Sequence, residues 1–194
     1  MRTIAALVLL TLSVAACAGV EEEAVDPVDP VYLAAAEQLC PIMWEWQKNV
    51  GATMNTMSYE ARLEEDALER RALYLRAFNR IRELNAQLDA TVVSLGDEDP
   101  LSRIAPDVRS GLEQSNSILE MTAARVDLEY SEFEAPGYSE IVPAIFLDVE
   151  KVIDVAKPEM ATYADPELTD AFIAVPQCQH GVKDANDGVP RYVP

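Results

Sequence analysis

Apolar residues recur at intervals of three and four along most of the chain, the spacing that places them on one face of an α-helix. The predicted helices cover residues 31–57, 58–95, 106–133, 143–163 and 167–175, and residues 99–105 add a short turn before the third. No alternation of apolar and polar residues indicates a set of strands. The chain is therefore predicted to be built from helices.

Pairs of Asp and Pro precede several of these stretches. An Asp side chain can cap the free amides of a first helical turn, and Pro fits the first helical position because its missing N–H is not needed there. The pairs at 29–30, 99–100 and 165–166 therefore predict helix starts. Gly96 is expected to end the second helix. Pro41 interrupts the first stripe and removes a backbone hydrogen bond, so a kink or a break is expected there.

Four long amphipathic helices with short connections bury their apolar faces best by packing together. About 160 ordered residues are enough for one hydrophobic core. We therefore predict a single all-α domain, a helical bundle of about four long helices plus a short C-terminal helix, over residues 31–176. Residues 177–194, which are rich in Gly, Pro, Asn and Asp, are expected to be coil.

The first residues have the layout of an export signal. Arg2 supplies a positive start, and residues 4–12 are almost entirely apolar. A helix that crosses a bilayer needs about 20 apolar residues, so this run is too short to remain as a membrane span. We therefore predict that residues 1–16 direct export and are then removed.

Small residues that end on a cysteine follow the apolar run. Val14, Ala15, Ala16 and Cys17 resemble the lipobox of bacterial lipoproteins, with Val where Leu is most common. The resemblance implies that a diacylglyceryl group is attached to Cys17, that the chain is cut before it, and that lipid holds the protein on the extracytoplasmic face of a membrane in the cell envelope. The alternative is an ordinary secretory signal that leaves Cys17 as a plain thiol.

The cysteine count bears on these two interpretations. The chain has three cysteines, and if Cys17 carries lipid, Cys40 and Cys178 remain as an even pair. Paired cysteines in an oxidising compartment normally form a disulfide. A metal site completed by His180 is an alternative, but a structural zinc site normally needs four ligands. We predict a Cys40–Cys178 disulfide and no metal site.

The composition is strongly acidic, with 34 Asp and Glu residues against 15 Lys and Arg and a formal net charge of −19. Removal of residues 1–16 takes away Arg2 and no acid, which makes the charge −20. Such a protein is not expected to bind nucleic acid, because phosphate binding requires clustered Lys and Arg. Residues 17–30 contain five acids and no aromatic residue, which predicts a flexible tether after Cys17 with a reach of about 20 Å.

One basic concentration stands out in this acidic chain. The second predicted helix carries five arginines, namely Arg70, Arg71, Arg76, Arg80 and Arg82. One interpretation is a patch that binds an anionic ligand or an acidic partner. The other is a set of ion pairs with acids on the same helix, because residues three or four positions apart on a helix can contact each other. The acids in reach include Glu69, Glu83 and Asp89.

Aromatic and sulfur-containing residues of the first helix are further candidates. Trp44 and Trp46 could line a ligand pocket, but two such neighbours on a helix point about 200° apart, so at most one of them shares the apolar stripe. Met43, Met54 and Met57 are soft ligands of the kind that copper prefers. Their spacing equally continues the apolar stripe, and core packing is the better interpretation.

Sequence signatures of enzymes are missing. The chain has no Gly-rich phosphate loop, no Gly-x-Ser-x-Gly and no His-Glu-x-x-His, and residues 184–188 match a calcium loop only in part. We therefore predict no cofactor and a non-catalytic interaction or structural module, anchored to the membrane through Cys17 and able to bind an envelope protein. The alternative is a small-ligand carrier or sensor that holds an anionic ligand near the five arginines.

Overall fold

The structure is a computed structural model, and it describes residues 28–96, 99–131, 138–158 and 165–178. Within these ranges the chain forms five α-helices and no strand. The helices are α1 (Pro30–Leu63), α2 (Ala67–Ser94), α3 (Leu101–Glu129), α4 (Tyr138–Ala156) and α5 (Pro166–Ala174). The predicted all-α class is confirmed.

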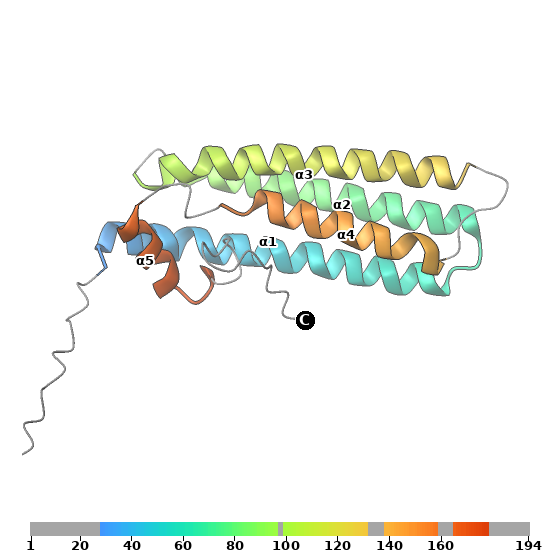
Figure 1. Cartoon of the computed structure of the whole chain (residues 1–194), viewed down its shortest axis with the longest axis horizontal. Helices are drawn as coiled ribbons and strands as arrows, with labels where there is room; N and C mark the ends of the chain where they lie inside the picture. The colour runs from blue at the N-terminus through green and yellow to red at the C-terminus, as the bar shows by residue number, and fades with distance from the viewer. Residues whose placement is uncertain (1–27, 97–98, 132–137, 159–164, 179–194) are drawn as a thin grey trace, which may run out of the picture.

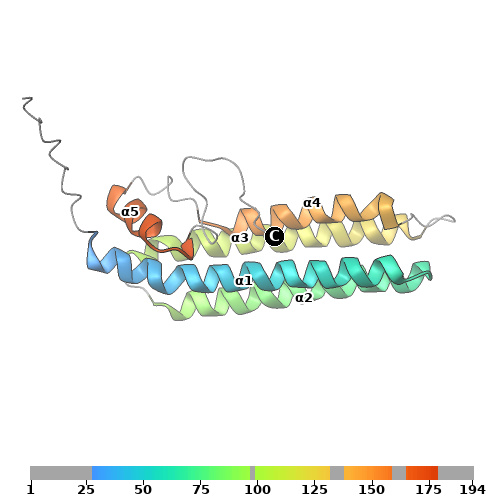
Figure 2. The same cartoon turned by 90° about the horizontal axis from the view of Figure 1, so that it is seen from below.

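The four long helices lie side by side as an antiparallel bundle, and the short α5 packs against the first part of α1 (Figures 1 and 2). Helices that follow each other in sequence are in contact from α1 to α4, and α4 also touches α1. We call the end at which α1 begins, next to the predicted tether, the near end. The opposite end, which holds the connection between α1 and α2, is the far end.

The core contains the apolar stripe that the spacing in the first helix predicted. Trp46 and the methionines 43, 54 and 57 are each at most 4% exposed. The largest fully buried side chains from the other helices are Tyr74, Phe78, Ile81, Ile104, Leu119, Ile145 and Leu168. All five helices therefore contribute to one core, and the three methionines are part of it.

Two of the three Asp-Pro pairs start helices in the predicted way. Asp29 accepts a hydrogen bond from the Val31 amide at 2.8 Å, and Asp165 accepts hydrogen bonds from the first-turn amides of α5. The pair at 99–100 also precedes a helix start, at Leu101, but the predicted capping there was wrong, because Pro100 occupies the cap position of α3 and no side chain caps that helix. Asp99 instead accepts a hydrogen bond from Arg103 Nε at 2.6 Å.

The boundary predicted between the first two helices was also wrong. α1 continues past Met57 to Leu63, and α2 begins at Ala67 instead of residue 58. The Asp66 carboxylate accepts hydrogen bonds from two first-turn amides, which makes this position a better helix cap than Ser58. The apolar stripe simply runs on through the buried Ala61.

Pro41 does not break α1, which is continuous from Pro30 to Leu63. The proline lies on the exposed side of the helix, and Glu37, the residue whose carbonyl loses its partner, is exposed as well. Water can therefore satisfy the free carbonyl, so the cost of the missing hydrogen bond is limited.

The third and fourth helices both begin earlier than the sequence indicated. α3 begins at Leu101 instead of residue 106, and α4 begins at Tyr138 instead of residue 143. In each case the proline that was taken as the start lies inside the helix, near its first turns, where it removes a single backbone hydrogen bond. α3 ends at Glu129 and α4 at Ala156, while residues 132–133 and 159–163 of the predicted helices lie outside the described ranges.

Gly111 allows α3 and α4 to pack closely. A Cβ atom at this position would overlap the Val155 carbonyl oxygen and lie 2.7 Å from the Cα of Ala156, both of which belong to the α4 backbone. A backbone cannot give way as a flexible side chain can, so the two helices would have to separate. The α3–α4 interface therefore requires a glycine here.

We expect Gly111→Ala to lower the free energy of unfolding by about 2 kcal/mol through overpacking. Gly51 in α1 is a matched control, because a Cβ there would meet no atom within 4 Å. Gly51→Ala should raise the free energy of unfolding by about 0.7 kcal/mol, since alanine is the better helix former. Urea denaturation of both variants measures the two effects, and equal changes of the same sign would contradict this account.

Candidate functional site

The five arginines of α2 do not form one patch. Arg70 lies at the C-terminal end of α1, where its guanidinium donates hydrogen bonds to the backbone carbonyls of Ala61 and Glu64, the shortest of them 2.6 Å. A positive charge at a helix C-terminus is favourable, because the last carbonyls lack partners within the helix. Arg70 therefore closes the turn between α1 and α2.

Arg71 and Arg82 are engaged elsewhere. Arg71 forms an ion pair of 2.8 Å with Asp127 of α3, and Arg82 donates a hydrogen bond to Asn79 one turn earlier on α2. Neither residue lines the groove between α1 and α2 that the remaining two arginines, Arg76 and Arg80, line. The predicted five-residue patch is thus reduced to Arg76 and Arg80.

Arg76 and Arg80 lie one turn apart and line an open groove between α1 and α2, with a volume of about 370 Å³. We call it the α1/α2 groove. Its polar lining from α1 consists of Asn49, Thr53, Thr56 and Glu60. Its apolar lining consists of Ala52, Met57, Leu73, Ala77 and Leu84. The groove therefore combines an apolar floor with two positive side chains on one wall and one carboxylate on the other.

The charges in the α1/α2 groove are accessible. Arg80 forms an ion pair of 2.8 Å with Glu83, the one pair with a nearby helical acid that the sequence predicted for these arginines. Both side chains are more than half exposed, so the pair contributes little and can be exchanged. Arg76 is exposed and forms no ion pair with any residue in the described ranges. Its guanidinium is available to a ligand or partner.

Trp46 does not reach the α1/α2 groove, although the sequence had placed it with the arginines as a candidate. Its indole N–H donates a hydrogen bond of 3.0 Å to the side-chain carbonyl of Asn85 in α2. The Asn85 amide in turn donates to the Ser115 hydroxyl at 2.8 Å and to Asn116 at 2.9 Å, both on α3. Trp44 is half-buried. Neither tryptophan lines the α1/α2 groove.

Asn85 is a residue that sequence reasoning missed. It is 1% exposed and joins three helices at the centre of the bundle. A signal was present, because Asn85 lies four residues after Ile81 and three before Leu88, at a position where the apolar stripe of α2 should continue. Nothing in the sequence shows, however, which partners its amide would meet.

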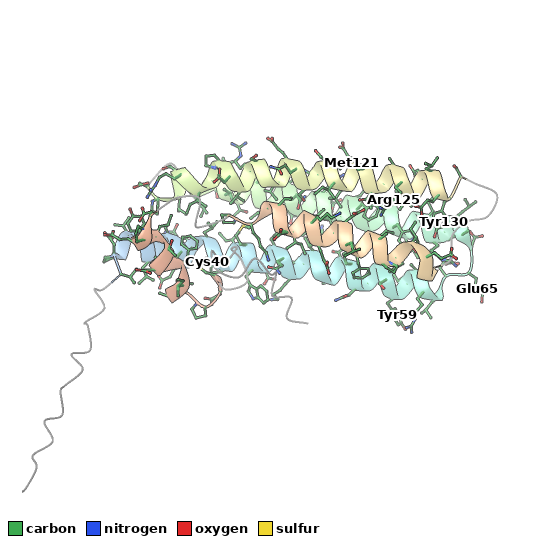
Figure 3. The ribbon with its side chains drawn as sticks, in the orientation of Figure 1. Cys40, Tyr59, Glu65, Met121, Arg125 and Tyr130 are labelled. Carbon is green, nitrogen blue, oxygen red and sulfur yellow. A yellow bond between two sulfur atoms is a disulfide. The ribbon has the colours of Figure 1, made fainter. Side chains whose placement is uncertain are left out.

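The disulfide predicted from the cysteine count is present between Cys40 of α1 and Cys178, which follows α5. Both cysteines are fully buried, and Figure 3 shows Cys40 at the near end, beside α5. The bridge fastens the last described segment to α1. His180, considered earlier as a third ligand, lies outside the described ranges, and within them no three His, Cys, Asp or Glu side chains gather in a metal-binding group.

A second polar cluster joins α1, α3 and the start of α5 at the near end. The Tyr32 hydroxyl donates a hydrogen bond of 3.1 Å to Asp165, and Arg103 forms an ion pair of 3.3 Å with the same carboxylate. The Arg103 guanidinium also lies 5.8 Å from the centre of the Tyr32 ring. These contacts hold the first turn of α5 in place.

The surroundings of this cluster favour its charged state. The backbone N–H of Leu168 lowers the pKa of Asp165, and the Tyr32 hydroxyl and Arg103 lower it further. The hydrogen bond with Tyr32 raises the pKa of Arg103, as do its contacts with Asp99 and Asp165. Because Asp165 and Arg103 each stabilise the ionised form of the other, the cluster acts as a structural link between α1, α3 and α5.

Asp148 joins α4 to α3. Its carboxylate is 2.8 Å from Arg125 and accepts a hydrogen bond of 3.1 Å from the Thr122 hydroxyl, and Lys151 lies at 3.4 Å. Figure 3 labels Arg125 on α3, above α4. The Asp148 side chain is only 17% exposed, so these contacts are partly shielded from water. Like the cluster around Asp165, they hold helices together.

Cys17, the residue on which the lipid anchor depends, lies outside the described ranges, as does most of the predicted tether. Among the described helices none is both long enough and apolar enough to cross a membrane. Comparisons of the chain with protein-family models, with curated proteins and with solved structures give no match.

Proposed function

We propose that this chain is a lipid-anchored protein of the cell envelope, held on the extracytoplasmic face of a membrane through Cys17. The observation that carries the proposal is the use of the cysteines. The disulfide takes up Cys40 and Cys178, so of the three cysteines in the chain only Cys17 is left for another role. That cysteine ends the lipobox-like motif, and the acidic stretch after it suits a tether between lipid and domain.

We further propose that the bundle is a non-catalytic module that binds another envelope protein. The buried side chains of Trp46, Asn85 and Ser115 bond to one another, as do Thr122 and Asp148, so these polar groups support the packing. The α1/α2 groove is largely open to solvent, whereas most ligand pockets enclose the molecule that they bind. The alternative, a carrier or sensor for a small anionic ligand, retains only Arg76 and Arg80 of the predicted arginines, which makes a protein partner the better fit.

The position of the groove suits this role. α1 begins directly after the tether and is 34 residues long, which corresponds to about 50 Å. The α1 residues that line the groove lie in its second half, toward the far end. The groove therefore lies in the half of the bundle that is farther from the tether.

Lipid attachment can be tested directly. Cells that express the full chain are grown with a labelled fatty acid, and we expect the label on the parent protein and none on Cys17→Ser, because the thiol is the acceptor. Ala18→Ser is the matched control, since it introduces the same residue next to the cysteine and should keep the label. A Cys17→Ser chain that retains the label would overturn the proposed anchor.

A further inference from the structure

The α1/α2 groove has the form of a site for a helix. It lies between two antiparallel helices, it is open, and its floor is apolar, with Met57, Ala77 and Leu84 each at most 5% exposed. An amphipathic helix binds such grooves by laying its apolar face along the floor. The groove residues Asn49 and Glu60 are eleven positions apart on α1, which corresponds to about 17 Å, or three helical turns.

Exposed apolar side chains extend this surface toward the far end. Leu63 follows the groove residues Thr56 and Glu60 by seven and three positions, so it lies on the same side of α1. Leu63 is 61% exposed and Tyr59, four residues before it, is 63% exposed. Figure 3 shows Tyr59 projecting from α1 away from the bundle. These two side chains therefore add exposed apolar surface beside the groove.

The charges indicate what kind of helix would bind. Arg76 and Arg80 are exposed cations on a chain whose net charge is −19. Carboxylates on a partner would pair with both arginines, and the weak ion pair between Arg80 and Glu83 would exchange for them. An anionic membrane surface does not fit, because the acidic domain as a whole would be repelled by it.

We propose that the α1/α2 groove, together with Leu63 and Tyr59, binds an amphipathic helix of an envelope protein whose carboxylates face Arg76 and Arg80. The inference rests on the proposed role of the bundle as an interaction module, and it specifies the surface and the chemistry of the partner. The bound helix packs its apolar side chains on Met57, Leu73 and Ala77. A helix of about four turns covers the distance from Asn49 to Leu63.

Site-specific photocrosslinking in the native cells tests the proposal with the full chain. A photoreactive amino acid replaces Ala52, which is exposed in the groove, or Ala124, which is exposed on α3 and lies outside the groove. We expect a crosslinked protein from position 52 and none from position 124. Mass spectrometry of the crosslinked segment should identify a sequence with apolar residues at helical spacing and Asp or Glu beside them.

Charge reversal tests the role of the arginines. We expect the double variant Arg76→Glu/Arg80→Glu to reduce the crosslink from position 52 about tenfold, which corresponds to the loss of about 1.4 kcal/mol of binding free energy. Lys151→Glu reverses an exposed charge on α4, outside the proposed surface, and should leave the yield unchanged. Circular dichroism melting verifies that all variants keep the fold.

The outcomes separate this inference from the function on which it rests. Crosslinks from position 124 only would overturn the groove as the binding surface while leaving the bundle an interaction module. A crosslink from position 52 that resists the reversal of Arg76 and Arg80, or that maps to a segment without acids, would overturn the proposed partner chemistry. The absence of any crosslinked protein from both positions would count against the interaction module itself.

Discussion

Replacement of both bridging cysteines, in Cys40→Ala/Cys178→Ala, should lower the free energy of unfolding by about 4–5 kcal/mol. The two residues are 138 positions apart, so the disulfide closes a loop that includes nearly the whole bundle. Such a loop restricts the unfolded chain, and its removal stabilises the unfolded state by restoring that freedom. Alanine keeps the two fully buried positions apolar, so the change reports mainly on the lost crosslink.

Urea denaturation followed by circular dichroism measures this effect. Cys17→Ser is introduced into the parent and the variant alike, so that neither lipid nor a third thiol contributes. Treatment of the parent with dithiothreitol should produce a similar loss, because it breaks the same bond without a mutation. A loss below about 1 kcal/mol would show that contacts other than the bridge already hold the two ends of the domain together in the unfolded chain.

Asn85→Ala should lower the free energy of unfolding by about 3 kcal/mol, which combines an unsatisfied indole N–H with the volume left by the amide. The Asn85 side chain bonds to Trp46 of α1 and to Ser115 and Asn116 of α3. Its removal leaves the Trp46 N–H, on a side chain that is only 4% exposed, without its partner. A buried donor of this kind loses the hydrogen bond it would make with water in the unfolded state.

A matched control and a double variant make this prediction sharper. Asn79→Ala, an exposed position on the same helix, should change the free energy of unfolding by less than about 0.5 kcal/mol. In Trp46→Phe no indole N–H remains to be left unpaired, so Asn85→Ala should cost less there than in the parent. Effects of Trp46→Phe and Asn85→Ala that simply add would contradict the proposed coupling between the two side chains.

The hydrogen-bonded group around Asn85 also bears on how the helices are aligned. A uniformly apolar interface tolerates displacement of one helix along another. A buried amide that must meet an indole on one helix and a hydroxyl on a second restricts the alignment of all three helices. Trp46, Asn85 and Ser115 are the residues that impose this condition. The same variants therefore test whether the bundle remains uniquely packed without the group.

Much of the fold was predictable from the sequence, because the relevant signals are local. The apolar spacing identified every helix, and the acidic caps at 29 and 165 located two of their starts. The errors in the starts of the third and fourth helices occurred where a proline, which suggests a helix start, lies inside a helix. Pro106 and Pro143 were taken as helix starts, but both lie inside helices that begin about one turn earlier. A single missing hydrogen bond near a helix start is tolerated when the rest of the helix is well packed.

The candidate site was predictable only in part. The sequence showed that five arginines are concentrated on one helix, but side chains of a helix point in directions that differ by about 100° per residue. The structure accordingly separates Arg70 and Arg71 from the pair that lines the groove. Which of these directions meets an acid, a backbone carbonyl or open solvent depends on the neighbouring helices, and no local pattern contains that information.

The sequence by itself determined the all-α class and the apolar stripe of the first helix, because the spacing leaves few alternatives. The pairing of Cys40 with Cys178 followed only once the lipobox resemblance set Cys17 aside. It also carries the motif at Cys17 on which the proposed membrane anchor rests. Only the tertiary structure decided that Trp46 faces Asn85 and that Arg76 and Arg80 face a groove. These contacts join residues far apart in the chain, and they are selected by the packing of whole helices.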